Sequence, residues 1–290
     1  MPELPEVESL RNLVESLLKG CTIDKIVFHE QGGGPRNDLI DDLVLETPRD
    51  QLEYAFLRRE LIAVSRKGKY LWFTMAPTHT VLFHFGMTGS FVIQGEKSLN
   101  YKSFSVSESW PPKFTKLELV FSNGKNLAFI DPRRLGRIKV LAQHPSECEP
   151  VKSLATDPFL EVLRPEVMRE QLSRYSAPIK TILLNQNKVC CGIGNYVADE
   201  VLFQSHIHPQ TPADALTEPM VQRLSEAITE VVHIAVQAQA DSQEFPKDWI
   251  FHHRWDKSSR DPHGHRILLS STGAIPTPMQ YVCYCMVTYY

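Results

Sequence analysis

The sequence predicts an α+β protein in which an N-terminal helix and a two-layer β-sandwich precede a helical region. Residues 21–140 contain seven or eight short runs of branched and aromatic residues separated by turn signals, which is typical of a sandwich or flattened barrel. From Pro165 onward, the apolar residues instead recur at helical spacing. A chain of 290 residues is expected to form one or two domains.

The first helix is predicted over residues 3–19, and Gly20 is expected to end it. Its apolar residues fall on one face: Leu4, Val7, Leu10, Leu13 or Val14, and Leu17. Burial of this face would fix the chain's first residues in space. A reactive group placed there would then be held rather than mobile.

The residues before this helix can carry chemistry. If Met1 is removed, the chain begins with the secondary amine of Pro2, followed directly by the carboxylate of Glu3. An α-amino group titrates near pH ~8, so part of it is neutral and nucleophilic at neutral pH. Such an amine condenses with an aldehyde carbon to an iminium, and Glu3 can serve as acid or base. The alternative is structural: proline and acidic residues also favour a helix start.

The sandwich strands are predicted from β-branched and aromatic runs. They are Ile23–Phe28, Glu60–Ser65, Tyr70–Met75, Val81–Phe85, Phe91–Ile93, Leu117–Phe121 and Leu127–Ile130. Asn123-Gly124 predicts a type I′ hairpin turn between the last two. Residues 100–112 are expected to form a surface loop.

Two turns in the sandwich place an apolar side chain beside cations. Residues 84–89 (HFGMTG) hold Met87 between two glycines, and residues 131–137 (DPRRLGR) hold Leu135 on a Pro/Gly turn. An apolar residue on such a loop is what a DNA wedge requires to hold a base step open. Taken singly, each turn can also be purely structural.

The domains are predicted as residues 2–140, a proline-containing linker over 141–165, a helical domain over 166–243 and a terminal region over 244–290. The expected helices are Glu166–Tyr175, Pro178–Gln186, Asn195–Ser205 and Pro219–Gln239. In the turn Gly192-Ile193-Gly194-Asn195, Asn195 is expected to cap the third of these helices and Lys180 to reach an anion at its positive end.

The net charge of −3 conceals a polarised distribution. Residues 57–70 carry +4 and residues 131–139 carry +3, so the remainder carries −10 and one basic face is possible. No apolar run approaches a membrane span, and no signal peptide is expected. The six cysteines show no CxxC pair, which predicts a reducing compartment without disulfides or zinc.

Four features in this order resemble the formamidopyrimidine-DNA glycosylase/endonuclease VIII family: the Pro2-Glu3 start, HFGMTG, DPRRLGR, and IKTILLNQ followed by GIGNYVADEVL and HIHP. The resemblance covers residues 2–256. The stretches 107–111 and 245–252 are similar to the plant and fungal branch, which lacks zinc. It implies a helix-two-turns-helix fold for the helical domain and a zincless finger in residues 244–290.

The resemblance implies excision of oxidised bases, above all oxidised purines, from damaged double-stranded DNA by a nuclear monomer that needs no cofactor. Pro2 would attack the sugar, Glu3 would protonate it, Lys69 would contact phosphate at the lesion, and Glu6 would anchor the first helix. The implied DNA contacts are His84, Lys180, Gly194 and Asn195 on backbone phosphates, and Met87, Arg133 and Leu135 in the space left by the flipped base.

The sequence departs from the family pattern at three places. The wedge position usually holds Phe, and Leu135 loses aromatic stacking worth about 1–3 kcal/mol per base. No zinc finger is expected, because Cys283-x-Cys285 and the nearby histidines lack paired zinc-ligand spacing. The Gly-Arg-Thr stretch of the finger is absent from residues 267–276, and residues 279–290 resemble nothing in the family. These last residues suggest an alternative splice or reading frame.

Two other functions remain open on the sequence. Without the finger arginine, the chain can be a catalytically weak binder of abasic or damaged DNA. It can also be an unrelated sandwich-plus-helix protein with a coincidental start. The altered loop at residues 257–266 leaves the choice between oxidised purines and oxidised pyrimidines open.

Overall fold

The computed structural model describes residues 2–29, 41–96 and 109–253. The chain divides into two compact units. The first runs to Ser153 and includes Gln239–Asp241, and the second comprises Leu154–Ala238 and the chain from Ser242 onward. Among the described residues, no helix has the length and apolar character of a membrane span.

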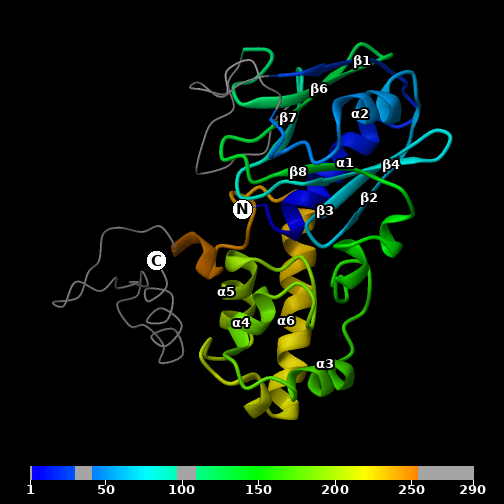
Figure 1. Ribbon diagram of the computed structural model, residues 1–290. Helices are drawn as coiled ribbons and strands as arrows, with labels where there is room; N and C mark the ends of the chain where they lie inside the picture. The colour runs from blue at the N-terminus through cyan, green and yellow to red at the C-terminus, as the bar shows by residue number, and fades with distance from the viewer. Residues whose placement is uncertain (1, 30–40, 97–108, 254–290) are drawn as a thin grey trace. The chain divides into compact units, whose positions relative to one another are not determined.

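The first unit is a two-layer sandwich preceded by an N-terminal helix, as the sequence predicted. Its helices are α1 (Leu4–Leu18) and α2 (Arg49–Phe56). Its strands are β1 (Ile23–Phe28), β2 (Leu61–Lys67), β3 (Tyr70–Met75), β4 (His79–His84), β5 (Ser90–Ile93), β6 (Thr115–Phe121), β7 (Asn126–Ile130) and β8 (Arg137–Leu141). One antiparallel sheet has the order β1-β6-β7-β5 and the other β2-β3-β4-β8 (Figure 1).

Alternating apolar residues explain how the sheets face one another. In β3, Leu71, Phe73 and Met75 are buried while the residues between them are half-buried, which is the two-residue period of a strand. Phenylalanines from both sheets meet in the core: the ring centroids of Phe73 and Phe91 are 5.5 Å apart. Burial of this aromatic layer joins the sheets into one core.

Helix α1 packs along β2 and β3 through the predicted apolar face. The fully buried residues are Leu4, Val7, Leu10, Val14 and Leu18, whereas Leu13 and Leu17 pack on the core only partly buried. Of the two residues that the sequence offered for this position, Val14 is therefore the buried one and Leu13 is not. Gly20 follows it with φ +81°, a conformation that favours glycine.

Three local features differ from the predictions. Helix α2 and strand β8 were not predicted, since α2 has only eight residues and β8 lies within a basic stretch whose Lys139 is exposed. The predicted type I′ turn at Asn123-Gly124 is wrong. Of the two residues, only Gly124 has positive φ, and its N–H donates to the Phe121 carbonyl at 2.9 Å. This is a type I turn that ends in a glycine bulge.

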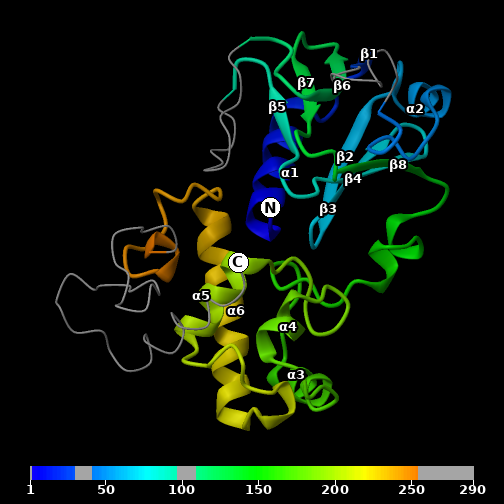
Figure 2. The same ribbon diagram turned by 60° about the vertical axis from the view of Figure 1, so that its left-hand side comes forward.

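The second unit contains the four predicted helices: α3 (Pro165–Leu172), α4 (Ile179–Leu184), α5 (Asn195–Gln204) and α6 (Glu218–Gln237). Helices α3 and α5 pack on α6, and α4 packs on α5 (Figure 2). The buried face of α6 includes Val221, Leu224, Ile228 and Val232, which recur at helical spacing. Between the end of β8 and the start of α3, over residues 142–164, the only helical turns are the short 3-10 segments Pro145–Glu147 and Val151–Ser153.

Candidate functional site

The N-terminal residues are held at the start of α1. Pro2 is buried and Glu3 is 3% exposed. Glu3 occupies the N-cap position, and its backbone N–H donates to Oε2 of Glu6 at 2.9 Å. Because α1 is anchored by its buried face, the ring of Pro2 and the carboxylate of Glu3 begin a fixed element of the first unit.

A buried ion pair ties α1 to the turn that carries Lys69. The Arg66 Nε lies 2.8 Å from Oε2 of Glu8, and the side chains are 0% and 4% exposed. Arg66 also donates to the carbonyl of Gly68 at 3.0 Å, directly before Lys69, which is 7% exposed. Sequence reasoning missed Glu8 and Arg66, which hold the N-terminal helix and the Lys69 turn as one piece.

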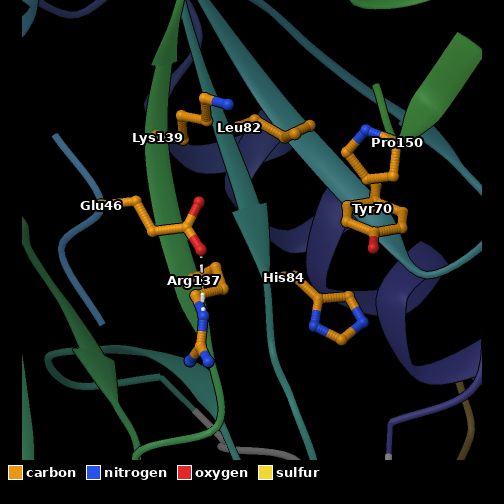
Figure 3. Close-up of a pocket in the computed structure, with 7 residues that line it drawn as sticks. All are labelled: Glu46, Tyr70, Leu82, His84, Arg137, Lys139 and Pro150. Atoms are coloured by element: carbon orange, nitrogen blue, oxygen red, sulfur yellow. Dashed lines mark ion pairs between the residues drawn. The ribbon is translucent and has the colours of Figure 1, made fainter. Parts of the chain in front are cut away.

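A basic pocket lies beside His84, at the end of β4 (Figure 3). Its cavity measures about 140 Å³ and is lined by Glu46, Tyr70, Leu82, His84, Arg137, Lys139 and Pro150. The Arg137 Nε pairs with Oε1 of Glu46 at 3.0 Å, so the lining keeps a net positive charge from Lys139. Apart from His84, none of these residues was predicted to form a site.

His84 is neutral in this pocket and presents a hydrogen-bond donor. Burial, together with the nearby charges of Lys69 and Arg137, lowers the pKa of His84 to about 4. The Gly86 N–H donates to Nδ1 of His84 at 3.3 Å, so the ring proton resides on Nε2. The Tyr70 ring lies 4.7 Å from the imidazole, centroid to centroid, and limits its rotation. A neutral Nε2–H suits a phosphate oxygen.

The three predicted space-filling residues lie on two loops that contact each other. Met87 is 38% exposed, Leu135 is 41% exposed, and Arg133 is exposed as well. Asp131 joins the loops: its carboxylate accepts from the Gly136 N–H at 2.6 Å, from the Arg133 N–H at 3.1 Å and from the Thr88 hydroxyl at 3.3 Å. The structure therefore places two exposed apolar side chains and one exposed arginine on two loops that Asp131 joins.

The second unit places the other predicted contacts around the start of α5. The predicted capping role of Asn195 is wrong, because Gly194 occupies the N-cap position and Asn195 is the first helical residue, with an exposed side chain. Lys180 lies 2.6 Å from Oδ1 of Asp199, which is 5% exposed in its side chain. An anion that binds Lys180 would therefore share the ammonium group of Lys180 with the carboxylate of Asp199.

Two further side chains shape this region and were not predicted. Gln186 accepts the Gly192 N–H at 2.8 Å and donates to the Ile193 carbonyl at 3.0 Å, which fixes the turn before α5. Glu200 is fully buried and accepts the Phe251 N–H at 3.1 Å. Burial raises the pKa of Glu200 to about 7. The Glu200–Phe251 contact joins residues 51 apart, so no local pattern indicates it, whereas Gln186 lies only six and seven residues from its two partners.

Several predictions lie outside the described residues: the loop at 257–266, the finger stretch at 267–276, the cysteines 283 and 285, and the tail from 279. Within the parts that the structure does describe, no group of three or more His, Cys, Asp or Glu residues could hold a metal ion.

Comparisons with known proteins match both units. Residues 1–138 match the formamidopyrimidine-DNA glycosylase N-terminal domain, and residues 154–247 match the H2TH domain of the same enzymes. Together these matches define a two-domain protein built from a glycosylase N-terminal domain and an H2TH domain. The chain belongs to the formamidopyrimidine-DNA glycosylase family.

Individual relatives agree with this assignment. The chain is 36% identical over 262 residues to a formamidopyrimidine-DNA glycosylase of Arabidopsis thaliana, a match that covers 90% of this chain and 64% of that relative. The MutM (Fpg) protein of Thermus thermophilus has a TM-score of 0.65 at 30% identity, covering 81% of this chain and 76% of that one. The Lactococcus lactis Fpg, crystallised with FAPY-dG-containing DNA, has a TM-score of 0.67 at 25% identity, covering 81% and 80%.

Proposed function

We propose that this protein is a DNA glycosylase and abasic-site lyase that removes oxidised purines from duplex DNA. The observation that carries the proposal is the placement of Pro2 and Glu3, both buried, at the start of an anchored helix. Membership of the formamidopyrimidine-DNA glycosylase family supports it. The chain spans 64% of the length of the Arabidopsis relative, so the activity is a proposal about this chain itself.

The first step would exchange the damaged base for the N-terminal amine. The neutral nitrogen of processed Pro2 bonds to C1′ of the deoxyribose as the bond from C1′ to the base breaks. The electron pair leaves with the base, which takes up the proton released from the Pro2 nitrogen. Protonated Glu3 donates to O4′, the ring bond from C1′ to O4′ opens, and the nitrogen lone pair completes an iminium.

The lyase steps would then use the iminium as an electron sink. Loss of a C2′ proton expels the 3′ phosphate with its C3′–O electron pair. Loss of a C4′ proton expels the 5′ phosphate in the same way, and water hydrolyses the iminium to return the Pro2 amine. The buried position of Pro2 and Glu3 supports this sequence, because a fixed nucleophile and acid avoid the entropy cost of ordering at each step.

The surrounding residues supply the DNA contacts in this proposal. A base within the duplex cannot be attacked, so it must be flipped out. His84 and the basic pocket would hold a backbone phosphate, and Lys69 would hold one at the lesion. Arg133 would pair with the orphaned base while Met87 and Leu135 fill the space. The exposure of these three side chains on joined loops supports that role.

A panel of lesions tests the proposal. Duplexes carrying 8-oxoguanine, a formamidopyrimidine, an oxidised pyrimidine, an abasic site or no damage are incubated with protein that begins at Pro2, and strand cleavage is measured. The proposal predicts cleavage at the two purine lesions and the abasic site, with phosphate on both ends. A salt-sensitive gel shift without cleavage would instead support a damaged-DNA binder.

A further inference from the structure

Arg134 adopts a backbone conformation that arginine disfavours. Its φ is +56°, in the left-handed region that non-glycine residues rarely occupy. It lies between Arg133 and Leu135, whose side chains are both exposed. A residue in this conformation persists only where surrounding contacts over-determine it.

The Arg134 guanidinium supplies such a contact through Asp41. Its Nε lies 2.6 Å and its Nη2 2.7 Å from the two carboxylate oxygens of Asp41. Asp41 is 7% exposed, and the Nζ of Lys116, itself 1% exposed in its side chain, lies 3.0 Å from the same carboxylate. A bidentate fork fixes both distance and orientation, which a single hydrogen bond does not.

Asp41 is itself anchored to the sheet. Its carbonyl accepts the N–H groups of Val44 and Leu45 at 3.0 and 2.9 Å. The Val44 carbonyl in turn accepts the Ile138 N–H of β8 at 2.8 Å. Asp41 therefore fixes the side chain of Arg134. Asp131 fixes the backbone on either side of it, by accepting the N–H groups of Arg133 and Gly136.

We propose that Asp41 and Arg134 are positioning residues that direct Arg133 toward the base opposite the lesion and thereby set opposite-base preference. The inference rests on the proposed function. Without the fork, the Arg134 backbone is free to leave the left-handed region. The backbone that carries the exposed side chains of Arg133 and Leu135 is then no longer fixed between them. Asp41 and Arg134 themselves need not touch DNA.

The test compares cleavage of 8-oxoguanine opposite cytosine with cleavage opposite adenine, under single-turnover conditions. The ratio of the two rates is independent of the fraction of active molecules, so a general loss of stability does not move it. The variants are Asp41→Asn, Arg134→Lys, which keeps the charge but loses the fork, and Arg133→Ala as the benchmark. Arg49→Lys is the matched control, because Arg49 pairs with Glu53 on the surface of α2.

Loss of a bidentate base contact lowers discrimination roughly 10-fold, so Arg133→Ala is expected to lower the ratio by about that factor. Asp41→Asn and Arg134→Lys are expected to lower it at least ~3-fold toward the benchmark, with Arg49→Lys at the wild-type value. If Asp41→Asn does not fold, Arg134→Lys decides. A wild-type ratio in these variants overturns the inference, even if Arg133→Ala is also without effect. A wild-type protein that cleaves neither duplex contradicts the proposed function instead.

Discussion

Gly86 and Leu135 are in such close backbone contact that a Cβ atom on Gly86 would lie 2.5 Å from the carbonyl carbon of Leu135. This contact joins the loop carrying Met87 to the loop carrying Arg133. Gly86 also has φ +58°, so glycine is required there for two independent reasons.

Substitution of Gly86 by alanine should therefore destabilise the first unit more than a positive φ alone does. Gly124→Ala is the matched control, because Gly124 has φ +80° but no atom within 4 Å of the added Cβ. Both substitutions cost about 1 kcal/mol of backbone strain. Gly86→Ala should lose a further 1–3 kcal/mol, roughly, from the backbone clash. Equal losses for the two variants in urea unfolding would show that the loops separate without resistance.

The buried Glu8–Arg66 pair should cost more to break than an exposed ion pair of the first unit. Glu8→Gln leaves the buried charge of Arg66 without its carboxylate, so we expect a loss of about 3 kcal/mol in the free energy of unfolding. Glu53→Gln breaks an exposed Arg49–Glu53 pair and should cost at most about 0.5 kcal/mol. Chemical denaturation of both variants checks the difference. Losses of the same size would show that the buried pair contributes no more than a surface pair.

His84 should act as a neutral donor across the physiological range. Its folded pKa of about 4 lies below the ordinary histidine value of 6.5, so between these pH values the unfolded chain binds a proton that the folded chain does not. As pH falls from 6.5 toward 4, this difference removes stability at up to ~1.4 kcal/mol per pH unit. His84→Gln should remove that slope yet keep DNA affinity, whereas His84→Leu should lose about 10-fold in affinity. A pH slope that His84→Gln leaves unchanged would contradict the neutral assignment.

Glu200 should give the second unit the opposite pH dependence. Burial raises its folded pKa to about 7 from 4.5, so its contribution is complete below pH 4.5 and is lost as pH rises through 7. Glu200→Gln can still accept the Phe251 N–H, and its amide can donate to a reoriented Gln204. The wild type should therefore lose stability relative to this variant as pH rises from about 4.5 to about 7, and the difference should level off at higher pH. If the urea midpoints of the wild type and of Glu200→Gln change in parallel over that pH range, the pKa of Glu200 is not raised.

The helices and strands that show a regular spacing of apolar residues could be predicted from the sequence. The 3.6-residue spacing of Leu4, Val7 and Leu10 placed α1, and the alternation of Leu71, Phe73 and Met75 matches β3. Helix α2 was not predicted because its eight residues are too few to show a clear helical spacing of apolar residues. The N-cap of α5 was predicted wrongly because a Gly-Asn pair at a helix start allows either residue to be the cap. In the structure Gly194 has an extended backbone, with φ −121°, and is therefore the N-cap.

The contacts that position the site could not be predicted in this way. Glu8 and Arg66 are 58 residues apart, and Asp41 and Arg134 are 93 apart. No local pattern brings such residues together, because their pairing depends on how the sheets and α1 pack. The candidate nucleophile and the loop tips were accessible to sequence analysis, whereas the side chains that orient them emerged only from the fold.

Borohydride trapping on duplex DNA containing 8-oxoguanine tests the central claim most directly, because reduction of the iminium leaves a stable bond between protein and sugar. Protein beginning at Pro2 should give a covalent adduct, and peptide mass analysis should locate the sugar on the Pro2 nitrogen. Protein that retains Met1 should give none. An adduct on a lysine side chain, or strand cleavage by folded, processed protein without any adduct, would contradict the assignment of Pro2 as the nucleophile.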